Sequence, residues 1–170
     1  MRAGDVDFIL GALSPAGYAS DLNGEALVDG ELAIVSRSGH PWARRQRIAL
    51  GHLVRAHWAL PRVNTPNRTL FERALASRGL SPPNVVVETS DLALLRAVLV
   101  NTDLLTAISA RQLSYELAAG LLTVLPVPLP DTRRVIGIMR RADSVASPGA
   151  TILMEEIARR CPAVLASIDW

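Results

Sequence analysis

The sequence predicts an α/β protein with two lobes, and three observations lead to this fold class. Short apolar runs alternate with helical patterns of ten or so residues, which is typical of a largely parallel or mixed sheet. The middle of the chain, about 30–127, has enough of these elements for one complete lobe. The patterns at 6–10 and at 135–160 cannot each close a core, so we expect them to meet in a second lobe.

The expected elements of the first half follow from apolar runs and their punctuation. The run at 6–10 ends at Gly11 and predicts a buried strand. A second β-type stretch at 27–35 is interrupted by Asp29 and Gly30, near the first expected crossing between lobes. The patterns then predict a short helix at 48–56, a strand at 57–61 and a helix at 67–78.

The second half continues the alternation. Gly79 and Gly120 each follow a helical pattern as its expected stop, and Ser90 is the expected cap of the helix after it. A second crossing is expected near 130–138. The predicted elements are strands at 84–88, 104–108, 122–127 and 135–141, and helices at 91–100, 110–120 and about 149–160.

The composition describes a packed protein with a mild positive charge. Hydrophobic residues make up 49% and charged residues 20% of the 170, and the formal net charge is +2. The arginines occur in short, scattered groups, which does not favour a nucleic-acid groove. Cys161 is alone and no apolar run could span a bilayer, so we expect a cytoplasmic protein without an internal disulfide.

Motifs that carry enzyme chemistry are missing from the sequence. There is no phosphate-binding glycine loop, and the histidines lack metal-ligand spacing. Ser36 and Ser38 lie near His40, but no carboxylate in that segment would orient the histidine as a base. We therefore predict no catalytic residue, no metal and no cofactor.

Short polar stretches recur where predicted strands lead into helices. They are "VNTPNRT" (63–69), "ETSD" (88–91) and "ISARQ" (108–112). In an α/β sheet such turns gather beyond the carboxyl ends of the strands, where ligands bind. Helix capping alone would explain any one of these turns, but three that share an edge favour a small-molecule site.

Five stretches carry a more specific pattern, and they cover nearly the whole chain. They are "AGDVDFILGAL" (3–13), "LAIVSRSGHPWARRQRIALGHL" (32–53), "WALPRVNTPNRTLFERAL" (58–75), "VVVETSDLALLRAVLVNTDLLTAIS" (85–109) and "LAAGLLTVLPVPLP" (117–130). In this order and spacing they resemble the effector-binding domain of LysR-type transcriptional regulators, near the branch of the galactose-binding-protein regulators.

The resemblance implies a two-lobe fold like that of type II periplasmic binding proteins, with one lobe complete and the other partial. The expected divisions are 1–28 (partial first lobe), 29–132 (second lobe) and 133–170 (return to the first lobe). The implied function is to sense a small-molecule effector in the cleft between lobes, without enzyme activity. The alternative is a small enzyme or a solute-binding protein on the same scaffold, such as a prephenate dehydratase-like domain.

The resemblance also implies partners and site residues. DNA would be bound only through a helix-turn-helix domain that this chain lacks, and the chain would associate as a dimer or tetramer. The effector, a carboxylate or a sugar, would meet Thr65 and Asn64 as donors and Arg68 as an anion partner. The full set of expected effector contacts is Leu13, Ser14, Asn64, Thr65, Asn67, Arg68, Thr89, Ser90 and Ser109.

One predicted helix, 91–100, is apolar on more than one face. In the resembling family this helix packs against a partner subunit, which makes it a dimer interface. The alternative is a helix buried on both sides within its own lobe. The interface residues implied by the resemblance are Leu92, Leu95, Val98 and Leu99.

Overall fold

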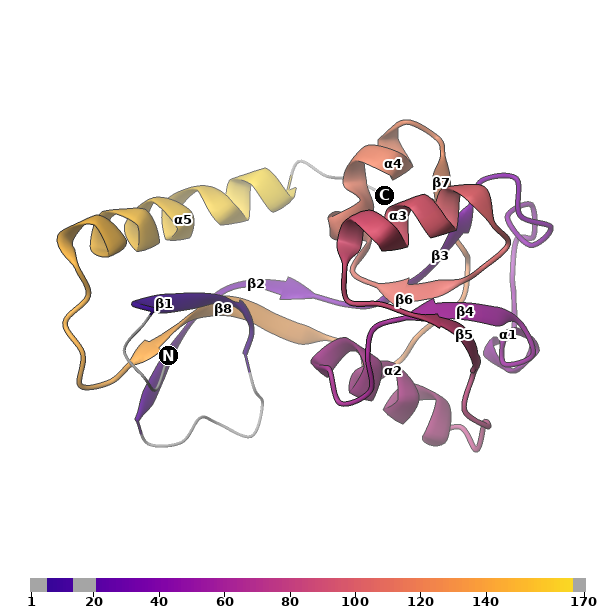
Figure 1. Cartoon of the computed structure of the whole chain (residues 1–170), viewed down its shortest axis with the longest axis horizontal. Coiled ribbons are helices and arrows are strands. Elements are labelled where there is room, and N and C mark those ends of the chain that lie inside the picture. The colour runs from indigo at the N-terminus through magenta and orange to yellow at the C-terminus, as the bar shows by residue number, and fades with distance from the viewer. Residues whose placement is uncertain (1–5, 14–20, 167–170) are drawn as a thin grey trace. The chain divides into compact units, whose positions relative to one another are not determined.

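A computed structural model of the chain describes residues 6–13 and 21–166, with side chains described as far as Cys161 (Figure 1). The chain divides into two compact units. The first unit contains the described residues up to Gly30 and those from Arg133 onward, and the second unit contains 31–132. Within the described residues, no helix is long and apolar enough to cross a membrane.

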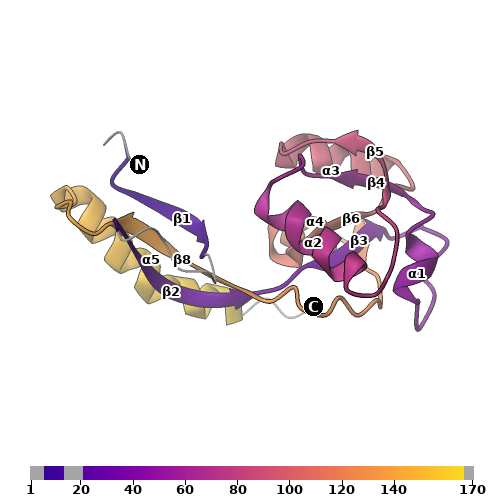
Figure 2. The ribbon, with the colours of Figure 1, turned by 90° about the horizontal axis from the view of Figure 1, so that it is seen from below.

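The first unit is an antiparallel sheet with one long helix. Strands β1 (Phe8–Ala12), β8 (Arg134–Arg141) and β2 (Leu22–Gly30) lie in the order β1-β8-β2. Helix α5 (Pro148–Ala166) runs along this sheet and contacts β2 (Figure 2). The strands approach closely at Gly137, where an added Cβ would collide with the carbonyl oxygen of Glu25.

The second unit alternates strands and helices, as the sequence predicts for an α/β protein. Its elements are β3 (Ala33–Arg37), α1 (Leu50–Leu53), β4 (His57–Leu60), α2 (Pro66–Ala76), β5 (Asn84–Glu88), α3 (Leu92–Asn101), β6 (Thr106–Ile108), the 3₁₀ turn η1 (Ala110–Leu113), α4 (Ser114–Ala118) and β7 (Leu122–Val124). The expectation of a mixed α/β fold is therefore confirmed.

Strand β4 lies between two parallel neighbours. It pairs with β5 on one side, and on the other Trp58 forms a parallel bridge with Leu105, just before β6. The N–H of Ala59 donates to the carbonyl of Leu105 at 2.8 Å. Because β3 pairs antiparallel with both β6 and β7, the strand order is β5-β4-β6-β3-β7 and only β3 runs the other way.

This topology defines two edges of the second unit. We call the edge where β4, β5 and β6 end the carboxyl edge, and the edge where they begin the amino edge. Helices α2 and α3 both start at the carboxyl edge, because each follows one of these parallel strands.

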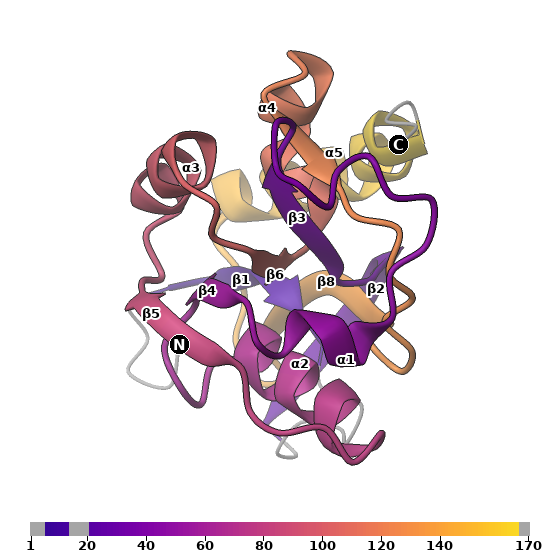
Figure 3. The ribbon, with the colours of Figure 1, turned by 90° about the vertical axis from the view of Figure 1, so that its right-hand side faces the viewer.

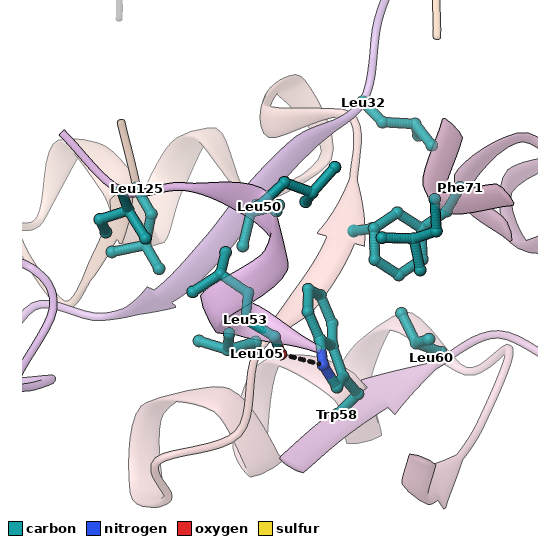
Figure 4. Packing of buried hydrophobic residues seen from close by; sticks show 12 residues of the cluster. Leu32, Leu50, Leu53, Trp58, Leu60, Phe71, Leu105 and Leu125 are labelled. Carbon is teal, nitrogen blue, oxygen red and sulfur yellow. Dashed lines mark hydrogen bonds between the residues drawn. The ribbon is translucent and has the colours of Figure 1, made fainter. Parts of the chain in front are cut away.

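The core of the second unit is built around Trp58, which is fully buried (Figure 4). The indole N–H donates to the carbonyl of Leu53 at 3.0 Å, so its one polar atom is satisfied. The Phe71 ring of α2 lies 4.8 Å from the indole, between ring centroids. This contact fixes α2 against the sheet and so fixes where α2 begins.

The stretch predicted as one interrupted strand at 27–35 is two strands in two units. β2 ends at Gly30 in the first unit, and β3 begins at Ala33 in the second. Within the second unit the N–H of Leu32 donates to the hydroxyl of Thr132 at 3.4 Å, and both residues are buried. The first and last residues of the second unit thus lie side by side.

The His-Pro turn after β3 is held by a buried histidine. His40 is 7% exposed, and its Nδ1 accepts the N–H of Trp42 at 3.0 Å. Burial lowers the pKa of His40 below its ordinary value of 6.5; the Asp103 carboxylate opposes this effect and Arg37 adds to it. Protonation would place a hydrogen on Nδ1 and break its bond to Trp42.

We expect the second unit to lose stability as the pH falls through about 6.5. The unfolded chain takes up a proton on His40 in that range, while the folded chain resists it because the pKa is lowered. The free energy of unfolding, measured with urea at about pH 7.5 and about pH 5.5, should fall less in His40→Asn than in the unmodified chain. Asparagine keeps an acceptor for Trp42, and His52→Asn at an exposed site is the control. An equal loss in all three proteins would contradict the role of His40.

Candidate effector site

Three polar turns meet at the carboxyl edge, following β4, β5 and β6. The strand order places β4 between the other two, so the turn into α2 is the central one. The N–H of Thr89 donates to the carbonyl of Leu60 at 3.0 Å and ties the turn after β5 to the end of β4. The turns that contain Thr65, Thr89 and Ser109 thus lie at the same edge of the second unit.

The polar residues of the turn into α2 first serve its backbone. Asn64 has φ 65°, a left-handed conformation that asparagine tolerates better than most residues. Thr65 is the N-cap, but its hydroxyl donates to the carbonyl of Arg62 at 2.7 Å and forms no capping bond to α2. Pro66 follows at a first-turn position, where no N–H is needed.

Arg68 also has a structural role. It is 7% exposed, its Nε lies 2.5 Å from Glu72 Oε1, and its Nη1 donates to the carbonyl of Pro61 at 3.3 Å. The guanidinium therefore joins the first turn of α2 to the end of β4. Two of its donors, Nε and Nη1, are thus used inside the unit, and a direct contact of Arg68 with the effector stays a prediction.

The turn into α3 is capped by Asp91, so the expectation that Ser90 is the cap is wrong. Asp91 Oδ1 accepts the N–H of Leu94 at 2.9 Å. The hydroxyl of Thr89 accepts the N–H of Asp91 at 3.1 Å and holds the carboxylate in place. Ser90 is exposed, which leaves its side chain available to a ligand.

The start of α2 differs from that of α3 in its charge. The first turn of α2 carries no acidic residue, and its N-cap side chain makes no bond to the helix. The N-terminus of a helix presents free N–H groups and a partial positive charge. At α3 the carboxylate of Asp91 already meets this partial charge. The turn into α2 contains no carboxylate, and Arg62, three residues before the N-cap, is exposed.

The other predicted contacts divide into three groups. Ser109 is half-buried at the start of η1 and makes no capping bond, and Asn67 is half-buried in the first turn of α2. Leu13 belongs to the first unit, where its N–H donates to the carbonyl of Val135 at 2.7 Å. Ser14 lies outside the described residues.

Helix α3 places its predicted interface leucines on different sides. Leu95 and Leu99 are 3% and 0% exposed and pack in the core of their own unit, so burial accounts for these two. Leu92 and Val98 are half-buried. The exposed apolar line of the helix is instead formed by Ala93, Leu94 and Ala97.

The sequence matches the LysR substrate binding domain family over residues 1–162. The chain belongs to this family. It is 47% identical over 154 residues to the HTH-type transcriptional regulator GalR of Pseudomonas putida, covering 91% of this chain and 38% of GalR. It is 28% identical over 157 residues to the HTH-type transcriptional regulator PcaQ of Agrobacterium fabrum, covering 92% and 50%. The chain thus spans half or less of the length of these regulators.

Solved structures agree with the LysR substrate-binding fold. The regulatory domain of CcmR from Synechocystis, in complex with 2-PG, has a TM-score of 0.79 at 17% identity and covers 94% of this chain and 75% of that domain. The effector binding domain of QuiR, in complex with shikimate, has a TM-score of 0.75 at 17% identity, with 94% and 73% covered. The predicted identity as a LysR-type effector-binding domain is confirmed, and the enzyme alternative is not favoured.

The assignment of the α3 cap can be tested by stability alone. Asp91→Ala should lower the free energy of unfolding by about 1 kcal/mol, the usual value of an N-cap, because the N–H of Leu94 loses its acceptor. Ser90→Ala, one residue earlier, should leave it unchanged, and urea unfolding followed by circular dichroism measures both. A lower free energy of unfolding in Ser90→Ala and an unchanged one in Asp91→Ala would show that Ser90 is the cap, as the sequence predicts.

Proposed function

We propose that this LysR substrate-binding domain senses a small anionic effector that carries hydroxyl groups. The start of α2, with its uncapped amides and no carboxylate, is the observation that carries the proposal. An effector carboxylate there would replace the water on those amides and complement the helix dipole. The exposed Arg62, whose carbonyl holds Thr65, adds positive charge nearby.

Hydroxyl groups of the effector would meet the neighbouring turns. Ser90 and Ser109 have side chains without a capping bond, and Asp91, next to Ser90, has a second carboxylate oxygen, Oδ2, that can accept. The complex of QuiR with shikimate supports the same class, because shikimate is a hydroxylated carboxylate. Of the two classes that the sequence leaves open, we therefore favour the carboxylate over the neutral sugar.

We further propose that the domain acts without bond-making chemistry and regulates transcription through its effector. GalR and PcaQ are named as transcriptional regulators, and this chain covers half of their length or less. Operator-specific DNA recognition would then belong to a helix-turn-helix segment outside this chain. We expect the domain to self-associate as a dimer or tetramer.

Effector binding can be tested by calorimetric titration, with shikimate and related hydroxylated carboxylates set against neutral sugars such as galactose. A hydroxylated carboxylate should bind, and Ser90→Ala or Ser109→Ala should weaken it about tenfold, the value of one hydrogen bond to a charged or polar ligand group. Ser81→Ala, at an exposed serine that follows α2, is the matched control. Binding of sugars but not of carboxylates would contradict the anionic class.

Self-association can be tested on the exposed line of α3. Leu94→Glu should give a folded chain with weaker association in sedimentation, because Leu94 is 50% exposed. Leu99→Glu should unfold the second unit instead, because it buries a charge in the core. If Leu94→Glu leaves the association state unchanged, α3 is not the interface.

A further inference from the structure

One long segment of the chain, which begins just before β3, carries basic residues and no acidic ones. Residues 32–71 contain seven arginines and no aspartate or glutamate. The chain has no lysine, so all 18 of its basic residues other than histidine are arginines. The spacing of these arginines in the sequence does not show whether they lie close together in space; the fold does.

The fold brings several of them to the amino edge of the second unit. Because β3 is antiparallel to its neighbours, it ends at this edge, and the segment 38–49 leads from there to α1 (Figure 3). The hydroxyl of Ser38 donates to the carbonyl of Gly120 at 2.6 Å and anchors that segment beside β7. Leu80 reaches α1 at Gly51, which places the turn after α2 at the same edge.

Five arginines of these connections, and of the short link between α1 and the start of β4, are exposed. None of the five forms an ion pair with a described residue. Asp103 is the one carboxylate in the connections along this edge, and Arg37 already binds it at 2.7 Å. The excess positive charge is therefore not neutralised within the second unit. The five residues, which we call the arginine edge, are Arg44, Arg45, Arg47, Arg55 and Arg78.

The chemistry of the arginine edge fits phosphate groups better than a protein surface. Protein interfaces are anchored by buried aromatic and apolar side chains. Among the connections described above, the one large apolar residue that is strongly exposed is Leu121, while Trp42 packs partly against His40. Guanidinium groups without an apolar anchor bind phosphate oxygens in pairs and need no shape-matched pocket.

We propose that the arginine edge binds the phosphate backbone of double-stranded DNA without reading its sequence. No recognition helix or base-reading side chain is required for this contact, since phosphates carry no sequence information. The contact would add to operator recognition by segments outside this chain and would weaken steeply with salt. It is independent of the effector site at the carboxyl edge.

The test uses the 170-residue chain and a labelled duplex of arbitrary sequence, with fluorescence anisotropy at a series of salt concentrations. The triple variant R44Q/R45Q/R47Q should reduce the slope of log K against log salt by about 2 to 3, because each lost phosphate contact removes about one counterion. The control R133Q/R140Q/R159Q removes the same charge at exposed positions of the first unit, which carries no residue of the arginine edge. It should keep most of the slope, and circular dichroism checks that both variants fold.

Two outcomes would overturn the proposal. Equal losses in the two triple variants would mean that net charge alone attracts DNA. Binding of polyglutamate but not of the duplex, lost in R44Q/R45Q/R47Q alone, would assign the arginine edge to an acidic protein instead.

Discussion

The parallel pairing of β4 with a neighbour on each side is the constraint on which the second unit depends. Trp58 belongs to this strand, and its indole is held by the carbonyl of Leu53 and by the ring of Phe71. Burying an indole of this size contributes a few kcal/mol, about 1.5–3 for a large apolar side chain. If β4 were displaced, α2 would lose its support and the three polar turns would no longer share an edge.

The same pairing separates two kinds of chemistry on one sheet. Parallel strands place all their helix starts at one edge, where free N–H groups and small polar side chains gather. Their returning connections reach the opposite edge, and here those connections are rich in arginine and almost free of carboxylates. The two proposed ligands, a small anion and an extended polyanion, would thus not compete for the same residues of this unit.

The sequence predicts the fold class and the clustering of the turns, because both follow from the alternation of strands and helices. It does not predict which polar side chain does what at each turn. Asp91 caps α3 in place of Ser90 because the backbone after β5 turns one residue later, once Thr89 is held by Leu60. The burial of Leu95 and Leu99, and the meeting of arginines that lie far apart in the sequence, depend on tertiary packing that no local pattern records.

The polar excess of the turn into α2 is explained mainly by its backbone. Asn64 permits a left-handed turn, Thr65 holds the carbonyl of Arg62, and Arg68 fastens the helix to β4. These residues fix the turn, and none of their side chains accepts a hydrogen bond from the first backbone N–H groups of α2. An anion bound there would be recognised by main-chain groups and a helix dipole, which supply charge complementarity but little shape selectivity. Selectivity among anionic effectors must then come from the side chains that are not committed, and those belong to the two flanking turns.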